Sequence, residues 1–66
     1  MITNNDLSDK NLILFKEAKR NNIDSLFTLL TNLLESDFGK SELIDFVKKH
    51  FKVVSEHCVN YIQKYN

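Results

Sequence analysis

Apolar residues recur along the whole chain with the three- and four-residue spacing of amphipathic helices. This spacing predicts helices over about residues 8–21, 24–38 and 41–65. The chain has no proline and a single glycine, Gly39, so it lacks the residues that tight β-hairpin turns require. We therefore expect an all-α fold: a small helical bundle made of a short αα-hairpin and a longer C-terminal helix.

The ends of the first two predicted helices carry recognisable capping residues. Ser8 is suited to accept a hydrogen bond from a free amide at the start of the first helix. The asparagine pair at 21–22 is expected to end that helix, because asparagine tolerates the left-handed conformation of a helix C-terminus. Asp24 or Ser25 should cap the second helix, and Gly39 should lie just beyond its end.

The continuity of the third predicted helix decides the architecture. Apolar positions keep one phase from Leu43 to Tyr65, which favours a single helix roughly 37 Å long at about 1.5 Å per residue. The two preceding helices are each expected to measure roughly 20 Å, so they would leave its C-terminal half uncovered. The alternative is a break near Ser55, which could cap a fourth helix that folds back into a four-helix monomer.

Length and charge restrict the class of protein. The 66 residues are expected to form one domain over 1–66, and 42% apolar with 27% charged residues is typical of a globular chain. Nine basic residues balance nine acidic ones, so no net charge draws the chain to nucleic acid or to a membrane surface. A single cysteine excludes an internal disulfide. No apolar run reaches the roughly 18 residues of a membrane span, and the N-terminal segment lacks the pattern of a signal peptide, so a cytoplasmic protein is expected.

Candidate catalytic and metal-binding groups do not combine into a recognisable site. His50 and His57 are separated by about 10 Å along a helix, which is too far to hold one metal ion between them. Cys58 lies on the apolar stripe, and the adjacent His57 does not face it, because helix neighbours point in different directions. We therefore expect no enzyme activity, no cofactor, no metal ion and no small-molecule substrate.

Uncovered apolar surface on two of the predicted helices favours association with protein. The apolar stripe of the second helix fills about half of its circumference, which is wider than one neighbouring helix can cover. The C-terminal half of the third helix would present a second surface of this kind. The candidate interface residues on the two surfaces are Phe27, Leu34, Cys58, Tyr61, Ile62 and Tyr65. We expect a small non-enzymatic regulator, adaptor or inhibitor that binds a protein partner or forms a homodimer. Its many asparagine, lysine and isoleucine residues are typical of a low-GC bacterium, its phages or its mobile elements.

Nucleic-acid binding is the first alternative function. Lys48, Lys49 and Lys52 could contact phosphates, as in a transcriptional regulator. Asp45 and Glu56 share their helix face, however, so the face is mixed in sign and is better interpreted as a solvated surface.

A second alternative comes from residues that resemble a known family. They are Asp24-Ser25-Leu26, Phe38-Gly39 and Tyr61-Ile62. The set is similar to the sequence of acyl carrier proteins, and this resemblance implies a helical carrier with a phosphopantetheine arm on Ser25. The chain departs from the family's pattern because no glycine directly precedes the motif and residues 27–34 contain no acidic residue.

Overall fold

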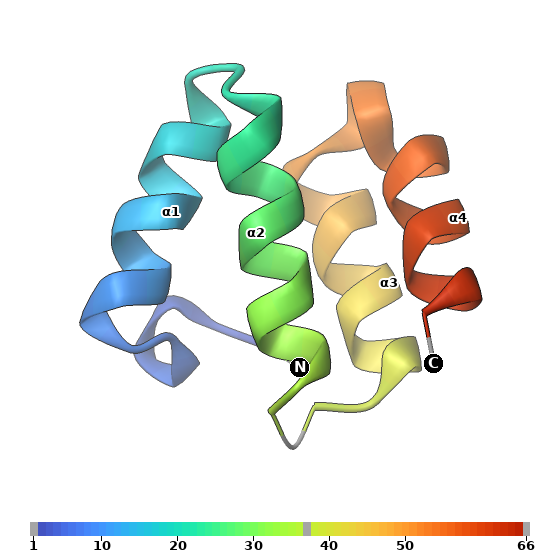
Figure 1. Cartoon of the computed structure of the whole chain (residues 1–66), viewed down its shortest axis with the longest axis horizontal. Coiled ribbons are helices and arrows are strands. Elements are labelled where there is room, and N and C mark those ends of the chain that lie inside the picture. The colour runs from blue at the N-terminus through green and yellow to red at the C-terminus, as the bar shows by residue number, and fades with distance from the viewer. Residues whose placement is uncertain (1, 37, 66) are drawn as a thin grey trace.

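The chain is built from helices throughout the part that the structure, a computed structural model, describes: residues 2–36 and 38–65 (Figure 1). The elements in chain order are η1 Asn4–Asp6, α1 Asp9–Lys19, α2 Ile23–Leu34, α3 Lys40–His50, η2 Lys52–Val54 and α4 Ser55–Lys64, where η denotes a short 3₁₀-helix. No strand occurs in these two ranges, so the predicted all-α fold class is confirmed. None of the described helices is both long enough and apolar enough to span a membrane.

The α1–α2 hairpin forms close to where its capping residues place it. Ser8 Oγ accepts a hydrogen bond from the amide three residues further on, at 3.3 Å, as predicted. Asn21 has a φ of 69° and provides the expected left-handed residue after α1. The cap of α2 differs from the prediction, because Asn22 Oδ1 accepts from the Ser25 amide at 3.1 Å and neither Asp24 nor Ser25 is the cap. The turn between the helices is consequently very short.

The prediction of one continuous helix over 41–65 is wrong, and the alternative of a break near Ser55 is correct. α3 ends at His50, Phe51 adopts φ −134° and ψ 51°, and η2 then turns the chain. α4 runs back alongside α3 in the opposite direction (Figure 1). The described Cα atoms extend over 25 × 25 × 19 Å, which leaves no room for the roughly 37 Å of an unbroken helix.

The break is stabilised by contacts on both sides of Phe51. From α1, Lys19 Nζ donates a hydrogen bond to the His50 carbonyl oxygen at 2.9 Å and so satisfies one of the free carbonyls at the end of α3. The Ser55 hydroxyl donates to the Lys52 carbonyl at 3.0 Å within the turn. Phe51 itself is buried against the core. The chain therefore leaves the helix at Phe51 without exposing a large aromatic side chain or leaving the last turn uncapped.

α2 ends earlier than the predicted boundary at residue 38. Its last helical residue is Leu34, and a backbone hydrogen bond from Ser36 N–H to the Leu33 carbonyl at 3.1 Å closes the final turn. This closure needs no left-handed residue. Gly39 instead precedes α3 with φ −75° and ψ 155°, so the prediction that it terminates α2 is wrong. Residue 37 lies outside the described residues.

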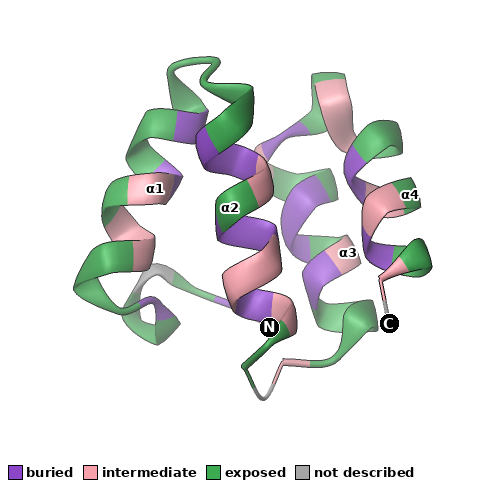
Figure 2. Cartoon of the chain, in the orientation of Figure 1, coloured by how far each residue is buried: buried purple, intermediate pink, exposed green. Residues whose placement is uncertain are grey.

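The core is centred on α2, which packs against α1 on one side and against α3 and α4 on the other (Figures 1 and 2). This central position accounts for the wide apolar stripe of that helix. The most deeply buried side chains are Leu26, Leu29, Leu30, Leu33, Leu43, Val47, Cys58 and Ile62. The last two come from α4, so the returning helix completes the core.

Candidate partner-binding groove

Two of the six predicted interface residues lie inside the protein. Cys58 and Ile62 are both 0% exposed, so the prediction that they form an outer surface is wrong. The physical reason is the break at Phe51, since it allows α4 to cover its apolar face with α2 and α3 of the same chain. The uncovered helix that favoured a homodimer therefore does not exist.

The other four predicted interface residues, Phe27, Leu34, Tyr61 and Tyr65, are half-buried. The rings of Phe27 and Tyr61 pack edge to face with their centroids 5.1 Å apart. The Tyr61 hydroxyl forms a hydrogen bond with the Thr31 hydroxyl, which joins α4 to α2. Tyr61 therefore helps to hold the bundle together, whereas Phe27 also borders a groove on the surface.

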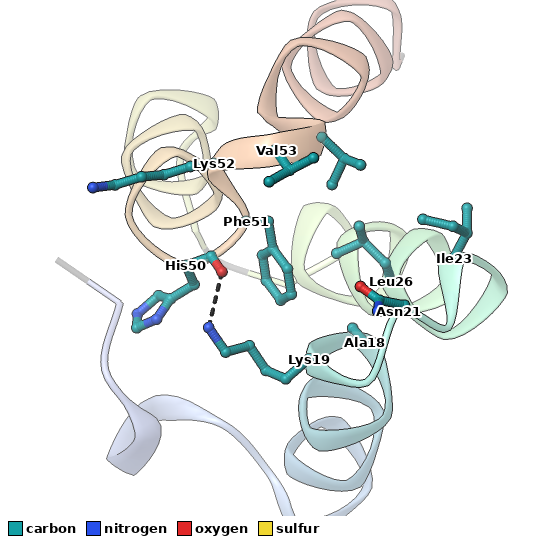
Figure 3. Close-up of a pocket in the computed structure, with 10 residues that line it drawn as sticks. Ala18, Lys19, Asn21, Ile23, Leu26, His50, Phe51, Lys52 and Val53 are labelled. Carbon is teal, nitrogen blue, oxygen red and sulfur yellow. Dashed lines mark hydrogen bonds between the residues drawn. The ribbon is translucent and has the colours of Figure 1, made fainter.

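This groove lies between the beginning of α2 and the beginning of α4. It consists of two adjoining pockets of about 200 Å³ and about 270 Å³, which share Ile23, Leu26 and Val54. We call it the α2–α4 groove, and its apolar lining includes Ile23, Leu26, Phe27, Phe51, Val53 and Val54. Figure 3 shows the first pocket, where Ala18 and Lys19 of α1 and Leu26 of α2 lie around the Phe51 ring.

The groove contains two of the three large apolar side chains that are exposed among the described residues. Three large apolar side chains are exposed among the described residues: Ile13 at 60%, Ile23 at 45% and Val53 at 98%. Ile13 stands on α1, but Ile23 and Val53 both line the groove. Single exposed apolar residues are common on protein surfaces, whereas adjoining ones at a hollow indicate an interaction site.

The groove is bordered by basic groups. Lys19, His50 and Lys52 line the first pocket and His57 lines the second, while none of the described aspartate and glutamate residues lines either. Lys19 Nζ is held at the His50 carbonyl and lies 5.5 Å from the centroid of the Phe51 ring. Lys19 and His50 lie in the last turns of α1 and α3, and helix C-termini favour basic residues.

His50 is held in its neutral form near pH 7 by its surroundings. Its ring packs on Phe15 and Phe46, with centroid distances of 5.3 and 5.0 Å. Burial lowers the pKa of His50 below its usual value of 6.5, and the charges of Lys19 and Lys49 lower it further. The positive charge that lines the first pocket therefore comes from Lys19 and Lys52 near neutral pH.

The three lysines of the nucleic-acid alternative do not line one common pocket. Lys48, Lys49 and Lys52 are all exposed. Lys52 borders the α2–α4 groove, whereas Lys49 lines a different hollow with the N-terminal segment, which includes Ile2 and Thr3.

Ser25 and Cys58, the two nucleophilic side chains considered from the sequence, are both buried. Ser25 is 9% exposed, and its hydroxyl donates a hydrogen bond to Glu17 Oε1 at 3.1 Å, so an arm on this oxygen would have to displace that contact. Burial raises the pKa of the Cys58 thiol, which keeps it protonated and unreactive. Within residues 2–36 and 38–65, no group of three or more histidine, cysteine or acidic residues is close enough to hold a metal ion.

Ile23 and Val53, the exposed apolar residues of the groove, were not among the interface residues predicted from the sequence. Ile23 lay just outside the predicted second helix, and Val53 lay within the predicted third helix. The consecutive β-branched residues Val53-Val54, followed by a serine, were the available signal for the helix break, since β-branched residues weaken a helix.

Comparisons of the chain with protein-family models, with curated proteins and with solved structures found no match.

Proposed function

We propose that this chain is a small non-enzymatic interaction module that binds a protein partner through the α2–α4 groove. The observation that carries the proposal is the exposure of Ile23 and Val53 on the same groove. Full burial of an aliphatic side chain of this size contributes about 1.5–3 kcal/mol. A partner that covers both side chains would therefore gain binding free energy from their burial.

The biological setting that fits this module is a cytoplasmic regulator, adaptor or inhibitor. The single cysteine, buried and unpaired, is compatible with a reducing compartment. The asparagine-, lysine- and isoleucine-rich composition supports an origin in a low-GC bacterium, a phage or a mobile element. A binding role also requires only a shaped apolar surface, and the groove provides one.

The proposal is tested by comparing two exposed apolar positions, one inside the groove and one outside it. Val53→Asp places a charge on the groove, and Ile13→Asp places the same charge on α1. Each protein is immobilised and exposed to an extract of the source cells, after circular dichroism has established that it is folded. The wild type and Ile13→Asp should retain the same partner, whereas Val53→Asp should bind it roughly tenfold more weakly or worse. Equal retention by all three proteins would contradict the proposal.

A second copy of this chain is the alternative occupant of the groove. Sedimentation of the purified wild type distinguishes the two cases. A dimer that Val53→Asp dissociates and Ile13→Asp preserves would identify self-association as the function of the groove. A monomer at high micromolar concentration would leave the groove free for a different protein.

A further inference from the structure

We infer that the partner segment is an acidic amphipathic helix, with apolar side chains that fill the α2–α4 groove and carboxylates that face its lysines. This inference rests on the proposed function, because it specifies the chemistry of what occupies the same groove. It follows from the sign of the charges at the groove, from the spacing of its apolar residues and from the lack of a strand in the described chain.

The charges that line the groove have one sign. Lys19 and Lys52 line the first pocket, and no acidic side chain among residues 2–36 and 38–65 lines either pocket. This is a local property, since the whole chain has equal numbers of basic and acidic residues. The acidic residues nearest in sequence, Glu17, Asp24 and Glu56, line neither pocket, and Glu17 accepts the hydrogen bond from the Ser25 hydroxyl. A partner with carboxylates beside its apolar residues would complement these lysines.

The form of the partner follows from the backbone chemistry of the site. No strand occurs in the described part of the chain, so an extended peptide would find no sheet edge to pair with. A helix satisfies its own backbone hydrogen bonds and needs only side-chain contacts. On the groove, Ile23 and Phe27 are one helical turn apart on α2, and Val54 borders the same pocket where α4 begins. Apolar side chains spaced three and four residues apart on a partner helix fit this pattern.

The test uses two synthetic amphipathic peptides of about 18 residues, long enough to form a helix. They share the same leucine positions and differ only in whether glutamate or lysine flanks them. Each is titrated into ¹⁵N-labelled protein at low salt and followed by NMR. We expect the glutamate peptide to shift the amide signals of Ile23, Val53 and Val54 and to bind at least about tenfold more tightly than the lysine peptide, with weaker binding as salt is added.

Two charge-reversed variants make the test specific to the groove. Lys52→Glu changes a lining residue, and Lys10→Glu changes the net charge equally at the beginning of α1. Lys52→Glu should reduce binding of the glutamate peptide several-fold and improve binding of the lysine peptide, whereas Lys10→Glu should alter neither by more than about twofold.

Three results would overturn the inference. They are equal affinity for the two peptides, shifts that lie outside the groove or are absent, and a short DNA duplex that shifts the groove signals more strongly than the glutamate peptide does. None of these results depends on the capture experiment with Val53→Asp and Ile13→Asp. A groove that captures its natural partner but does not discriminate between the peptides would therefore contradict the inference alone.

Discussion

Ile62→Ala is the substitution that most clearly separates the observed fold from a continuous third helix. Ile62 is 0% exposed in α4, where it packs in the core beneath α2 and α3. Truncation of a fully buried isoleucine to alanine costs about 2–5 kcal/mol, because apolar contacts are lost and a cavity remains. A chain of 66 residues has a total stability of roughly 3–10 kcal/mol. The variant should therefore lose a large fraction of its free energy of unfolding.

The assay is urea unfolding followed by the circular dichroism of the helices. Val53→Ala is the matched control, since Val53 is 98% exposed and its truncation should change the free energy of unfolding by less than about 0.5 kcal/mol. If Ile62→Ala leaves too little folded protein to analyse, Ile62→Val should still lower stability by about 0.5–1.5 kcal/mol. If Ile62→Ala unfolds at the same urea concentration as Val53→Ala, α4 does not complete the core and the reasoning is refuted.

Three further predictions concern single positions. Cys58 is fully buried, so Ellman's reagent should not modify it in the folded protein and should titrate one thiol per chain in urea; rapid modification without denaturant would show that α4 does not bury it. Asn21 has a left-handed backbone, so Asn21→Gly should leave the unfolding midpoint unchanged or slightly higher, and Asn21→Val should lower stability by more than about 1 kcal/mol. Burial and the neighbouring lysines lower the pKa of His50 in the folded chain, so the unfolded chain protonates His50 at a higher pH than the folded chain does. The contribution of His50 to the free energy of unfolding should therefore be constant above about pH 6.5 and fall as the pH drops below it. His50→Gln should lose this pH dependence of urea unfolding, and His57→Gln should retain it.

Local signals in the sequence were sufficient to predict α1 and the presence of α2, but not the cap or the end of α2. Ser8 and Asn21 mark the two ends of α1 through side-chain and backbone preferences that act over a few residues. The leucine spacing of α2 predicted a helix with neighbours on both sides, and the structure places it at the centre of the core. These features could be read from the sequence because their causes lie within one or two helical turns.

The break after His50 was predicted only as an alternative, because the local signals in the sequence favoured one continuous helix. The apolar positions of α3 and α4 keep one helical phase through it, and neither proline nor glycine marks it. One contact that stabilises it, from Lys19 Nζ to the His50 carbonyl, joins residues 31 positions apart. The burial of Cys58 and Ile62 provides the driving force, and it exists only after α4 has folded back.

The candidate groove also forms only when α4 folds back after the break at Phe51. Phe27 was predicted at an interface from the width of the α2 stripe, and it does border the groove. Val53 was interpreted as one residue in a long helix, but the turn at η2 directs it into water. A site formed by a helix break can be predicted only once the break itself is known.

Site-specific photo-crosslinking tests the role of the α2–α4 groove most directly. A photoreactive amino acid such as benzoylphenylalanine replaces Val53 in one protein and Ile13 in another, and both are irradiated in the cells from which the chain derives. These positions suit the comparison because both are exposed apolar sites and only the first borders the groove. We predict a covalent adduct with one protein from position 53, lost when Ile23 is also changed to aspartate, and no such adduct from position 13. Absence of an adduct from position 53, or the same adduct from both positions, would contradict binding through this groove.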